Sequence, residues 1–401
     1  MTSSRSAVSS RILLVTGKGG VGKTTVAAAT ALATADAGLR TMVLSTDPAH
    51  SLGDAFGIEL GSAPRRIDGD LWGQQLDATE RLEDAWGEIQ SYIVAVLQWA
   101  GADTVEAEEL AVIPGLEEIF ALADIKAFAE SGDWDVVIVD CAPTAETLRL
   151  LSLPDILGWY MDRIFPATRG VAGLLRPLVS RITSAPVAGD DVFAATRRFY
   201  ERLDGVRALL TDPELTSARL VITPERMVIA EARRLSTYLS LFGYRVDAVV
   251  VNRLLPDAVT DPWFKAWKET QAEHVAEIED AFSPLPLLRA DLAADEIVGL
   301  ARLRELAEEL YESVDAAAVL HSEPPLRVER RGDALVLVLE LPFADRDELE
   351  LGRRHDELLV RVGPHRRALM LPDSLRRRSV AGATMVDDRL EVTFGAAEED
   401  V

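Results

Sequence analysis

The sequence predicts an α/β protein with a mostly parallel, doubly wound sheet, followed by a smaller all-β sandwich domain. Three observations support this fold class. An apolar run, a glycine-rich loop and an alanine-rich segment follow one another within residues 11–37, which is the order strand, loop, helix. Continuous apolar runs of strand length recur later and alternate with segments of helical period, as in βαβ units. After Pro324 the pattern changes to alternating apolar and polar residues, which is typical of strands with one buried face.

The glycine-rich loop follows the first predicted strand and satisfies the pattern G-x-x-x-x-G-K-[ST]. Its glycines let backbone N–H groups face phosphate oxygens, and the next helix directs its positive N-terminal end at the same charges. We expect Lys23 to reach the β- and γ-phosphates of ATP and the Thr24 hydroxyl to serve Mg²⁺. The alternative is a glycine-rich turn with a surface lysine. The predicted nucleotide contacts are Gly17, Lys18, Gly19, Gly20, Val21, Gly22, Lys23, Thr24 and Thr25.

A second lysine, Lys18, directly follows the first glycine of the loop. We expect its side chain to point out of its own loop and to complete a phosphate site across a dimer interface, as an arginine finger does in trans. The alternative is a lysine that contacts only solvent. The first interpretation implies a homodimer.

The next predicted strand, residues 41–45, leads into Asp47-Pro48-Ala49-His50-Ser51. Open α/β sheets bind ligands at the carboxyl ends of their strands. Asp47 is therefore a candidate to position or polarise the water that attacks the γ-phosphate, with His50 and Ser51 as nearby switch residues. The alternative is that Asp47-Pro48 only forms a turn before a helix.

Residues 134–140 form a continuous apolar run that ends in a carboxylate, which is the pattern of a Walker-B strand. Because a phosphate loop lies upstream, we expect Asp140 to sit near Mg²⁺ and to contact it through water. Ala142-Pro143-Thr144 is expected to form a second loop that senses the γ-phosphate.

Helical insertions are expected at about 78–130 and 153–212, with helices at 78–99 and from residue 116 to about 129. Residues 156–165 crowd apolar and aromatic side chains together. Such helices either pack against a partner helix or offer a surface to a ligand. We expect helix packing for most of these residues and a client-binding surface for the rest.

Further strands are expected at 71–76, 219–223 and 246–251, and further helices at 227–242 and 299–311. Asn252 directly follows the last of these strands. Its amide donates and accepts hydrogen bonds at once, as an adenine edge requires, so it is a candidate base reader. The alternative is an asparagine that starts a turn. Pro286 and Leu287 are candidates to wall the base pocket.

A domain boundary is expected at Pro324-Pro325. Beyond it, alternating leucines at 335–341 and short apolar runs at 357–362, 368–371 and 390–394 predict a small β-sandwich. The predicted organisation is a disordered N-terminus at 1–10, a nucleotide-binding domain at 11–314, a linker at 315–325, a sandwich at 326–395 and an acidic tail at 396–401.

The composition restricts the class of protein. At 401 residues and 48% hydrophobic content, the chain can bury two or three cores. Its apolar runs are shorter than the roughly 18 residues of a membrane span, and its polar start lacks a signal-peptide core, so we expect a cytoplasmic protein. The single cysteine, Cys141, excludes disulfides and multi-thiolate metal sites within one subunit. A net charge of −24 argues against a nucleic-acid partner.

Four segments together, at 17–25, 47–51, 140–144 and 251–252, closely resemble the ATPases that drive arsenite pumps or target tail-anchored membrane proteins. The resemblance covers about residues 11–313 and includes the lysine-second loop of the deviant Walker-A group. It implies an ATP hydrolase that acts as a homodimer. The equivalents of Lys18 then reach across the nucleotide-closed interface, those of Asp47 activate water and those of Asn252 contact adenine.

The C-terminal region also resembles the small-heat-shock-protein-like sandwich that is appended to some bacterial members of this family, which implies a chaperone or docking role. Two departures stand out. The arsenite pumps bind their metalloid through several cysteines, and the eukaryotic targeting ATPases clamp their dimer with paired C-x-x-C motifs, whereas this chain has one cysteine. Because As(III) prefers thiolates, the sequence argues against activation by arsenite.

Three hypotheses follow. The first is a dimeric Mg²⁺-dependent ATPase that opens and closes an apolar surface for a hydrophobic helical or membrane-protein client, with a possible membrane partner. The second is an ATP-gated chaperone with slow hydrolysis. The third is a metalloid-stimulated pump subunit, which a rise of ATPase activity with arsenite would identify.

Overall fold

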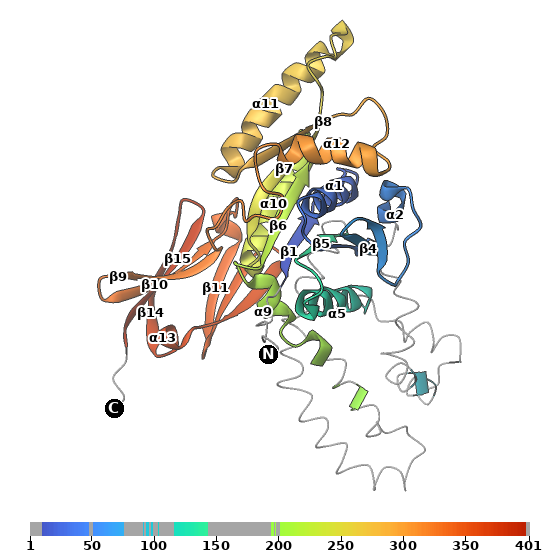
Figure 1. Ribbon diagram of the computed structural model, residues 1–401. Coiled ribbons are helices and arrows are strands. Elements are labelled where there is room, and N and C mark those ends of the chain that lie inside the picture. The colour runs from blue at the N-terminus through green and yellow to red at the C-terminus, as the bar shows by residue number, and fades with distance from the viewer. Residues whose placement is uncertain are drawn as a thin grey trace.

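The computed structural model describes residues 10–47, 51–75, 116–142 and 201–397, together with single residues at 91, 94, 95, 98, 103, 194, 195 and 197. In these ranges the chain forms an α/β domain and a C-terminal β domain (Figure 1). The expected fold class is therefore confirmed. The expectations for Pro143 and Thr144 and for the apolar stretch at 156–165 lie outside the described residues. Of the helix expected at 78–99, the structure describes residues 91, 94, 95 and 98, and all four are helical.

Eight strands form the central sheet, in the spatial order β3-β4-β2-β5-β1-β6-β7-β8. All neighbours pair in parallel except β3 with β4. The strand that precedes the glycine-rich loop, β1, lies between β5 and β6, where the strand order reverses and α/β sheets bind their ligands. The strands are β1 (Arg11–Thr16), β2 (Thr41–Ser45), β3 (Arg65–Asp68), β4 (Leu71–Gln75), β5 (Val136–Asp140), β6 (Thr216–Ile222), β7 (Val246–Leu254) and β8 (Leu287–Asp291).

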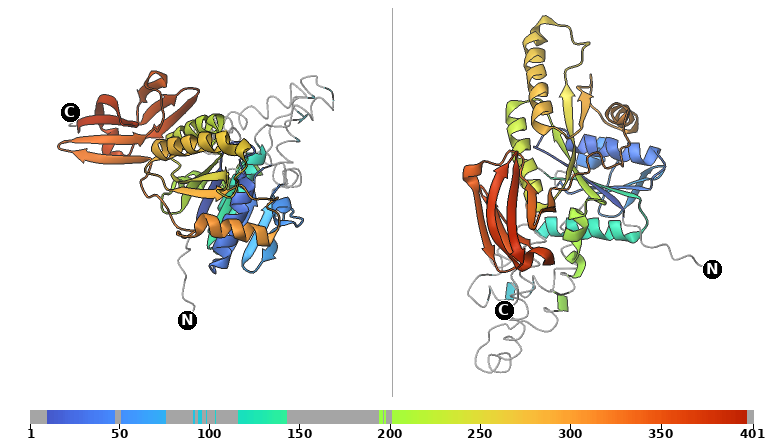
Figure 2. Two further views of the ribbon diagram at one scale, coloured as in Figure 1. Left: turned by 90° about the horizontal axis from the view of Figure 1, so that it is seen from above. Right: turned by 90° about the vertical axis from the view of Figure 1, so that its left-hand side faces the viewer.

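Helices cover both faces of this sheet. Helices α1 (Lys23–Asp36) and α12 (Leu300–Tyr311) pack together on one face, and α10 (Arg226–Phe242) and α11 (Lys265–Phe282) lie on the other (Figure 2, left). Because helices cover them on both sides, β2 and β5 are buried along their whole length. The remaining helices of this domain are α2 (Ser51–Phe56), α5 (Leu116–Ser131), α9 (Val206–Thr211) and the short 3-10 helix η1 (Pro262–Phe264).

Several elements were not expected from the sequence, among them helix α11 and strands β3 and β8, and strand β7 is longer than expected. Helix α11 buries only Ile278 and Phe282, so its apolar stripe is too narrow to stand out as a helical period. Strand β3 is short and partly exposed. Strand β7 continues to Leu254, which places Asn252 inside the strand rather than after it. None of the described helices is long and apolar enough to cross a bilayer.

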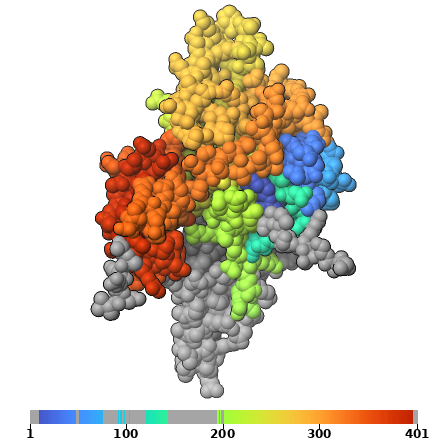
Figure 3. All heavy atoms as spheres, turned by 60° about the vertical axis from the view of Figure 1, so that its left-hand side comes forward, coloured from blue at the N-terminus to red at the C-terminus, as the bar shows by residue number. Residues whose placement is uncertain are grey.

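The C-terminal domain is a sandwich of a four-stranded sheet, β14-β15-β10-β9, and a three-stranded sheet, β11-β12-β13. The alternating leucines of β10 point into its core together with Phe394. The domain lies directly against the α/β domain (Figure 3). Its elements are β9 (Leu326–Arg331), β10 (Ala334–Glu340), η2 (Arg346–Glu348), β11 (Leu349–Arg354), β12 (Glu357–Val362), β13 (His365–Met370), α13 (Asp373–Arg376), β14 (Arg378–Val386) and β15 (Arg389–Ala397).

The segment between the two domains is fixed to the sheet at the amino ends of its strands. The buried carboxylate of Asp247 accepts a hydrogen bond from the Leu320 N–H. Three arginines hold the carbonyl groups of this segment: Arg11 donates to Ala317 (3.1 Å), Arg219 to Ala318 (3.1 Å) and Arg245 to Ser322 (3.3 Å). Residues 315–322 therefore form an anchored strap along the sheet rather than a free tether.

Candidate active site

The glycine-rich loop leaves β1 and enters α1 at the carboxyl edge of the sheet. Gly20 and Gly22 have φ values of 82° and 94°, which L-residues with a Cβ rarely adopt. A Cβ on Gly17 would collide with the carbonyl oxygen of Val221 on the neighbouring strand β6. The curled loop conformation therefore requires glycine at these positions.

Lys23 is the first residue of α1 and is 6% exposed. Its ammonium donates to the carbonyl oxygen of Lys18 over 3.3 Å, so the side chain folds back along the inside of the loop. A positive charge beside the N-terminus of a helix is poised for an anion, because both attract negative charge. The loop and Lys23 together form a cradle that suits a phosphate chain.

Asn252 braces this cradle from β7. Its Nδ2 donates to the carbonyl oxygen of Val21 over 2.8 Å, and its Oδ1 accepts from the Arg253 N–H over 2.9 Å. The amide lies so close to Gly22 that a Cβ there would strike it. An asparagine side chain has two N–H groups and two acceptor lone pairs. After these bonds, one N–H group and one acceptor lone pair of Asn252 remain. An adenine edge needs one donor and one acceptor of this kind.

The structure does not bring Pro286 and Leu287 to the level of Asn252. Leu287 pairs with Val249, and Pro286 accepts a hydrogen bond from the Val249 N–H. Both lie at the start of β8, three residues lower in the sheet than Asn252, which corresponds to about 10 Å along the strand direction. The residues at the level of Asn252 are those near the end of β8.

Asp140 ends β5 beside the cradle and is paired in register with Ser45 and Val15. Its carboxylate is fully buried; Oδ2 accepts from the Ser45 hydroxyl (3.3 Å) and Oδ1 has no hydrogen-bond partner. Burial raises the pKa of Asp140 to about 7, while the nearby Thr24 hydroxyl and Lys23 ammonium lower it and the Asp47 carboxylate raises it further.

These groups fit a Mg²⁺ ion. A buried carboxylate oxygen without a partner needs a cation or a donor, and Mg²⁺ prefers oxygen ligands. The Thr24 hydroxyl lies next to this carboxylate, and it forms a 3.1 Å hydrogen bond with the Ser51 hydroxyl. The residues that would hold the ion are thus Thr24 and Asp140, with Ser51 close by.

Asp47 follows β2 at the same edge, and its half-buried carboxylate interacts electrostatically with Asp140. Its N–H donates to the Ser45 hydroxyl over 3.3 Å. The structure thus brings Asp47, Asp140 and Lys23 together, as the sequence predicts. Pro48, Ala49 and His50, and the loop residues Pro143 and Thr144, lie outside the described residues.

Thr46 connects the two loops that follow β2 and β5. Its N–H and its hydroxyl both donate to the carbonyl oxygen of Asp140, over 3.0 Å and 3.3 Å. The hydroxyl also accepts from the Ala142 N–H over 3.1 Å. Sequence reasoning missed Thr46 because a threonine after a strand is unremarkable. The only available signal was its place at the carboxyl end of a buried strand.

Lys18 points away from the cradle toward α10. Its ammonium lies 3.6 Å from the Glu231 carboxylate, and the two side chains are 30% and 27% exposed. The Lys18 side chain lies on the outside of the loop. Glu231 could not be anticipated from the sequence, because it is separated from Lys18 by more than two hundred residues.

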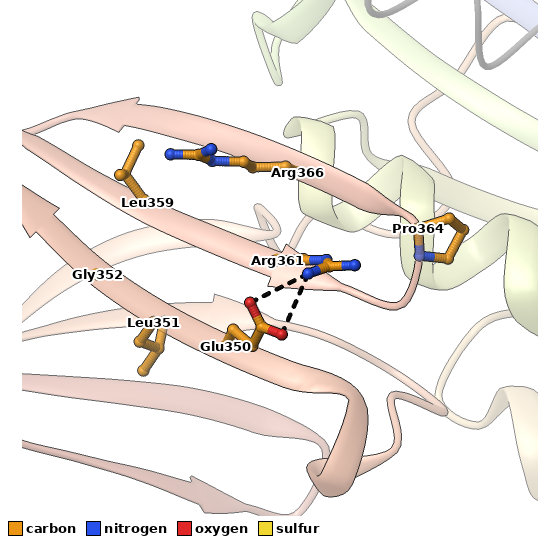
Figure 4. A pocket seen from close by; sticks show the side chains of 7 residues that line it. All are labelled: Glu350, Leu351, Gly352, Leu359, Arg361, Pro364 and Arg366. Atoms are coloured by element: carbon orange, nitrogen blue, oxygen red, sulfur yellow. Dashed lines mark hydrogen bonds and ion pairs between the residues drawn. The ribbon is translucent and has the colours of Figure 1, made fainter.

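A separate surface hollow of about 490 Å³ lies on the three-stranded sheet of the C-terminal domain (Figure 4). Arg361 pairs with Glu350 there over 3.2 Å. The hollow belongs to a different domain from the glycine-rich loop and is not part of the candidate active site. Its lining residues are Glu350, Leu351, Gly352, Leu359, Arg361, Pro364 and Arg366.

Comparison with known proteins gives two matches to family profiles. The family described as anion-transporting ATPase matches residues 10–312. A profile described as the HSP20-like domain found in ArsA matches residues 332–394. The first match contains the whole cradle and its neighbours, and the second contains most of the C-terminal sandwich.

Several curated proteins are similar over most of their length. One from Aquifex aeolicus (strain VF5), described as a candidate arsenical pump-driving ATPase, is 37% identical over 390 residues, which cover 95% of this chain and 98% of that protein. A similarly described protein from Chlorobaculum tepidum is 37% identical over 96% of both chains. The ATPase ASNA1 homolog of Trypanosoma cruzi is 29% identical over 76% of this chain and 92% of its own.

Proposed function

The chain belongs to the anion-transporting ATPase family and is an ATP hydrolase, and on this premise we propose that it works as a Mg²⁺-dependent ATPase in a nucleotide-bridged homodimer. Opening and closing of the dimer would move an apolar helical surface that holds a hydrophobic client. The observation that carries this proposal is the convergence of Lys23, Thr24, Asp140 and Asp47 at the carboxyl edge of one sheet.

Each of these residues has a distinct task. The backbone N–H groups of the loop and the Lys23 ammonium hold the β- and γ-phosphates and compensate their charge. Thr24 and Asp140 would hold Mg²⁺, which supplies further charge compensation when bound. Asp47 orients the attacking water and accepts its hydrogen bond, since it lies at the same edge beside Asp140. Asn252 offers its remaining donor and acceptor to adenine.

Lys18 supports the homodimer in this proposal. Its ammonium leaves its own loop and is partly exposed, so it is available to a nucleotide on a second subunit, where it would act as an arginine finger does. The names of the relatives, an arsenical pump-driving ATPase and an ASNA1 homolog, support a role in moving a substrate or client.

A second candidate function is an ATP-gated chaperone with slow hydrolysis, favoured by the HSP20-like domain.

Stimulation of the ATPase by arsenite is the hypothesis with the least support. Cys141 is fully buried, and burial raises the pKa of its thiol to about 12, so the thiolate that As(III) requires is not formed. We expect arsenite to leave the ATPase rate unchanged.

The Asp47→Asn substitution tests the proposed mechanism. The amide keeps the shape of the carboxylate but cannot accept a proton, so turnover should fall at least 100-fold while ATP binding stays within a few-fold. Asp54→Asn, on the exposed face of α2, is the matched control and should keep full activity. Unchanged steady-state hydrolysis by the Asp47 variant would remove Asp47 from the mechanism.

The same variant tests the client hypothesis. A protein that binds ATP without hydrolysing it should accumulate in its closed form and retain the client. Capture of a hydrophobic helical segment, such as a tail-anchored membrane protein, only by the ATP-loaded variant would support the proposal. Equal capture with and without nucleotide would contradict an ATP-gated client surface.

The proposed dependence on Mg²⁺ is tested by metal removal. Chelation of divalent cations with EDTA should abolish hydrolysis, and added Mg²⁺ should restore it.

A further inference from the structure

Helix α10 contacts both the glycine-rich loop and the C-terminal domain. Near its N-terminus, the Glu231 carboxylate pairs with the Lys18 ammonium over 3.6 Å. The helix continues to Phe242 without interruption. The family profile for the ATPase and that for the HSP20-like domain match separate parts of the chain, so α10 is a physical connection between two units.

The second half of α10 lies under the C-terminal domain. The ring of Tyr238 contacts that of His365 in a tilted arrangement with 4.0 Å between centroids, and Leu241 belongs to the core of the C-terminal domain. The Leu241 carbonyl accepts a hydrogen bond from Arg367, and the Thr237 hydroxyl donates to the Pro342 carbonyl. These contacts combine apolar burial with hydrogen bonds to backbone carbonyls, so the C-terminal domain is docked on the helix through several kinds of interaction.

Glu231 lies on the same side of the helix as Tyr238 and Phe242, two of the residues that contact the C-terminal domain. Residues separated by seven and eleven positions fall on one stripe of an α-helix, which places Glu231, Tyr238 and Phe242 in line. Glu231 and Tyr238 are separated by about 10 Å along the helix axis. The helix between them is regular, so it connects the end under the C-terminal domain directly with Glu231.

The pairing of Lys18 with Glu231 competes with its use at a phosphate. A lysine ammonium that is neutralised by a carboxylate on its own subunit has to leave that carboxylate before it binds a triphosphate. Both side chains are about one-third exposed, so the exchange has a low cost, because solvent screens such pairs. The contact is therefore suited to a reversible restraint.

We propose that Glu231 is a positioning residue that holds Lys18 on its own subunit in the resting state, and that the C-terminal domain sets the strength of this restraint through α10. When two subunits close on ATP, Lys18 exchanges the Glu231 carboxylate for phosphate oxygens. This inference rests on the proposed role of Lys18 across the dimer. A ligand that shifts the C-terminal domain would change the ATP response without contacting the nucleotide.

Substitution of Glu231 by Gln tests the restraint, because it removes the charge and keeps the shape. We expect the ATP concentration at half-maximal rate to fall by a factor of two to five, which is the range for exposed ion pairs. The protein concentration needed for half-maximal specific activity should fall similarly. Glu273→Gln, on the exposed face of α11, is the matched control and should behave as the unmodified protein.

A double-variant cycle with Lys18→Ala, measured as the equilibrium affinity for ATP so that no turnover is needed, assigns the effect to this pair. If Glu231 acts through Lys18, Glu231→Gln should have no effect in the Lys18→Ala background. If Glu231→Gln changes the ATP affinity equally in both backgrounds, or does not change it when Lys18 is present, the proposed restraint is overturned. If Lys18→Ala alone keeps full activity, the proposed function of Lys18 fails instead, so the two failures are distinguishable.

The role of the C-terminal domain is tested by His365→Ala, which removes the ring that lies on Tyr238. We expect the same direction of change as for Glu231→Gln, and no further change when both substitutions are combined. Met370→Ala, on the same strand and 58% exposed, is the control. Circular dichroism and gel filtration verify folding. A folded His365→Ala protein with loosened docking and an unchanged ATP response would overturn the coupling.

Discussion

The side-chain amide of Asn252 donates a hydrogen bond to the backbone carbonyl of Val21 over 2.8 Å. A residue of β7 thereby fixes the shape of a loop that follows β1, across the intervening strand β6. Asn252 is 6% exposed, and its amide lies against Gly22. The adenine contact proposed for Asn252 and the shape of the glycine-rich loop therefore depend on one side chain.

This contact gives a first prediction for Asn252→Asp and Asn252→Ala. A carboxylate would face the Val21 carbonyl with no proton to share, and alanine would leave that carbonyl unpaired, which costs about 1–3 kcal/mol. We expect the affinity for ATP to fall about 5- to 100-fold, more for aspartate than for alanine. Equilibrium binding of a fluorescent ATP analogue measures the loss.

Binding of inorganic tripolyphosphate separates the two roles of Asn252. A residue that only reads adenine would leave the affinity for a base-free triphosphate unchanged. Because Asn252 also holds the loop, both variants should bind tripolyphosphate more weakly. Retention of full tripolyphosphate affinity would show that the bond to Val21 does not shape the cradle.

The sequence predicted the residues that lie at the strand ends but not the contacts between distant segments. Asp47, Asp140 and Asn252 were identifiable because buried strands end at or near them, and parallel strands share one ligand-binding edge. The partners Val21 and Glu231 were not identifiable, since each contact joins segments that are far apart in the chain and depends on the final packing. Local pattern alone does not encode such pairings.

The same limit explains why the sequence did not reveal that Pro286 and Leu287 lie lower in the sheet than Asn252. They follow Ser283 after α11, a helix that the sequence pattern did not reveal. Without that helix, the register of β8 against β7 was not predictable, and the distance between Leu287 and Asn252 could not be judged. The C-terminal sandwich was easier to predict, because its alternating leucines repeat at the period of a strand.

A second prediction concerns Thr46, whose hydroxyl ties the loop after β2 to the loop after β5. Thr46→Val keeps the shape but leaves the Ala142 N–H without its 3.1 Å acceptor. Asp47 and Asp140, on the two loops, should then lose their relative alignment. We therefore expect kcat to fall about 10-fold with little change in ATP affinity. Steady-state kinetics and binding measure the two effects. Thr46→Ser restores the hydroxyl and should recover the rate; failure of this rescue would contradict the proposed bridge.

A third prediction concerns the buried ion pair of Arg219 with Asp247, both of which have fully buried side chains. Asp247 also accepts from Ser217 over 2.7 Å. Asp247→Asn would leave the Arg219 charge without its counter-ion, so the free energy of unfolding should fall by about 3–5 kcal/mol.

Denaturant unfolding of Asp247→Asn measures this loss, and Asp135→Asn is the matched control. Asp135 pairs with Arg40 over 2.8 Å at an exposed position, where a pair contributes at most about 1 kcal/mol. Equal losses for the two variants would show that the buried network does not stabilise the fold. A loss confined to Asp247→Asn would also identify the anchor of the strap, since Leu320 donates to the same carboxylate.

The last prediction follows from His365, whose ring lies between the C-terminal domain and the rings of Tyr238 and Phe242 on α10. Burial lowers the pKa of His365, because the charged imidazolium is poorly solvated there. The unfolded protein has an ordinary histidine pKa of about 6.5. The neutral ring therefore stabilises the docked domains fully above about pH 6.5.

This stabilisation is lost as the pH falls through the lowered pKa of the folded state, because folding or docking then requires release of a proton. Stability measured by denaturant unfolding should decrease between pH 7 and pH 5, and His365→Gln should remove that part of the decrease. His355→Asn, in an exposed turn, should keep it. If the His365→Gln protein loses stability with the same slope as the unmodified chain, the acid sensitivity of the docked domains has another origin. If that part of the decrease disappears, the neutral imidazole of His365, on β13, controls the contact with α10 that the proposed restraint on Lys18 depends on.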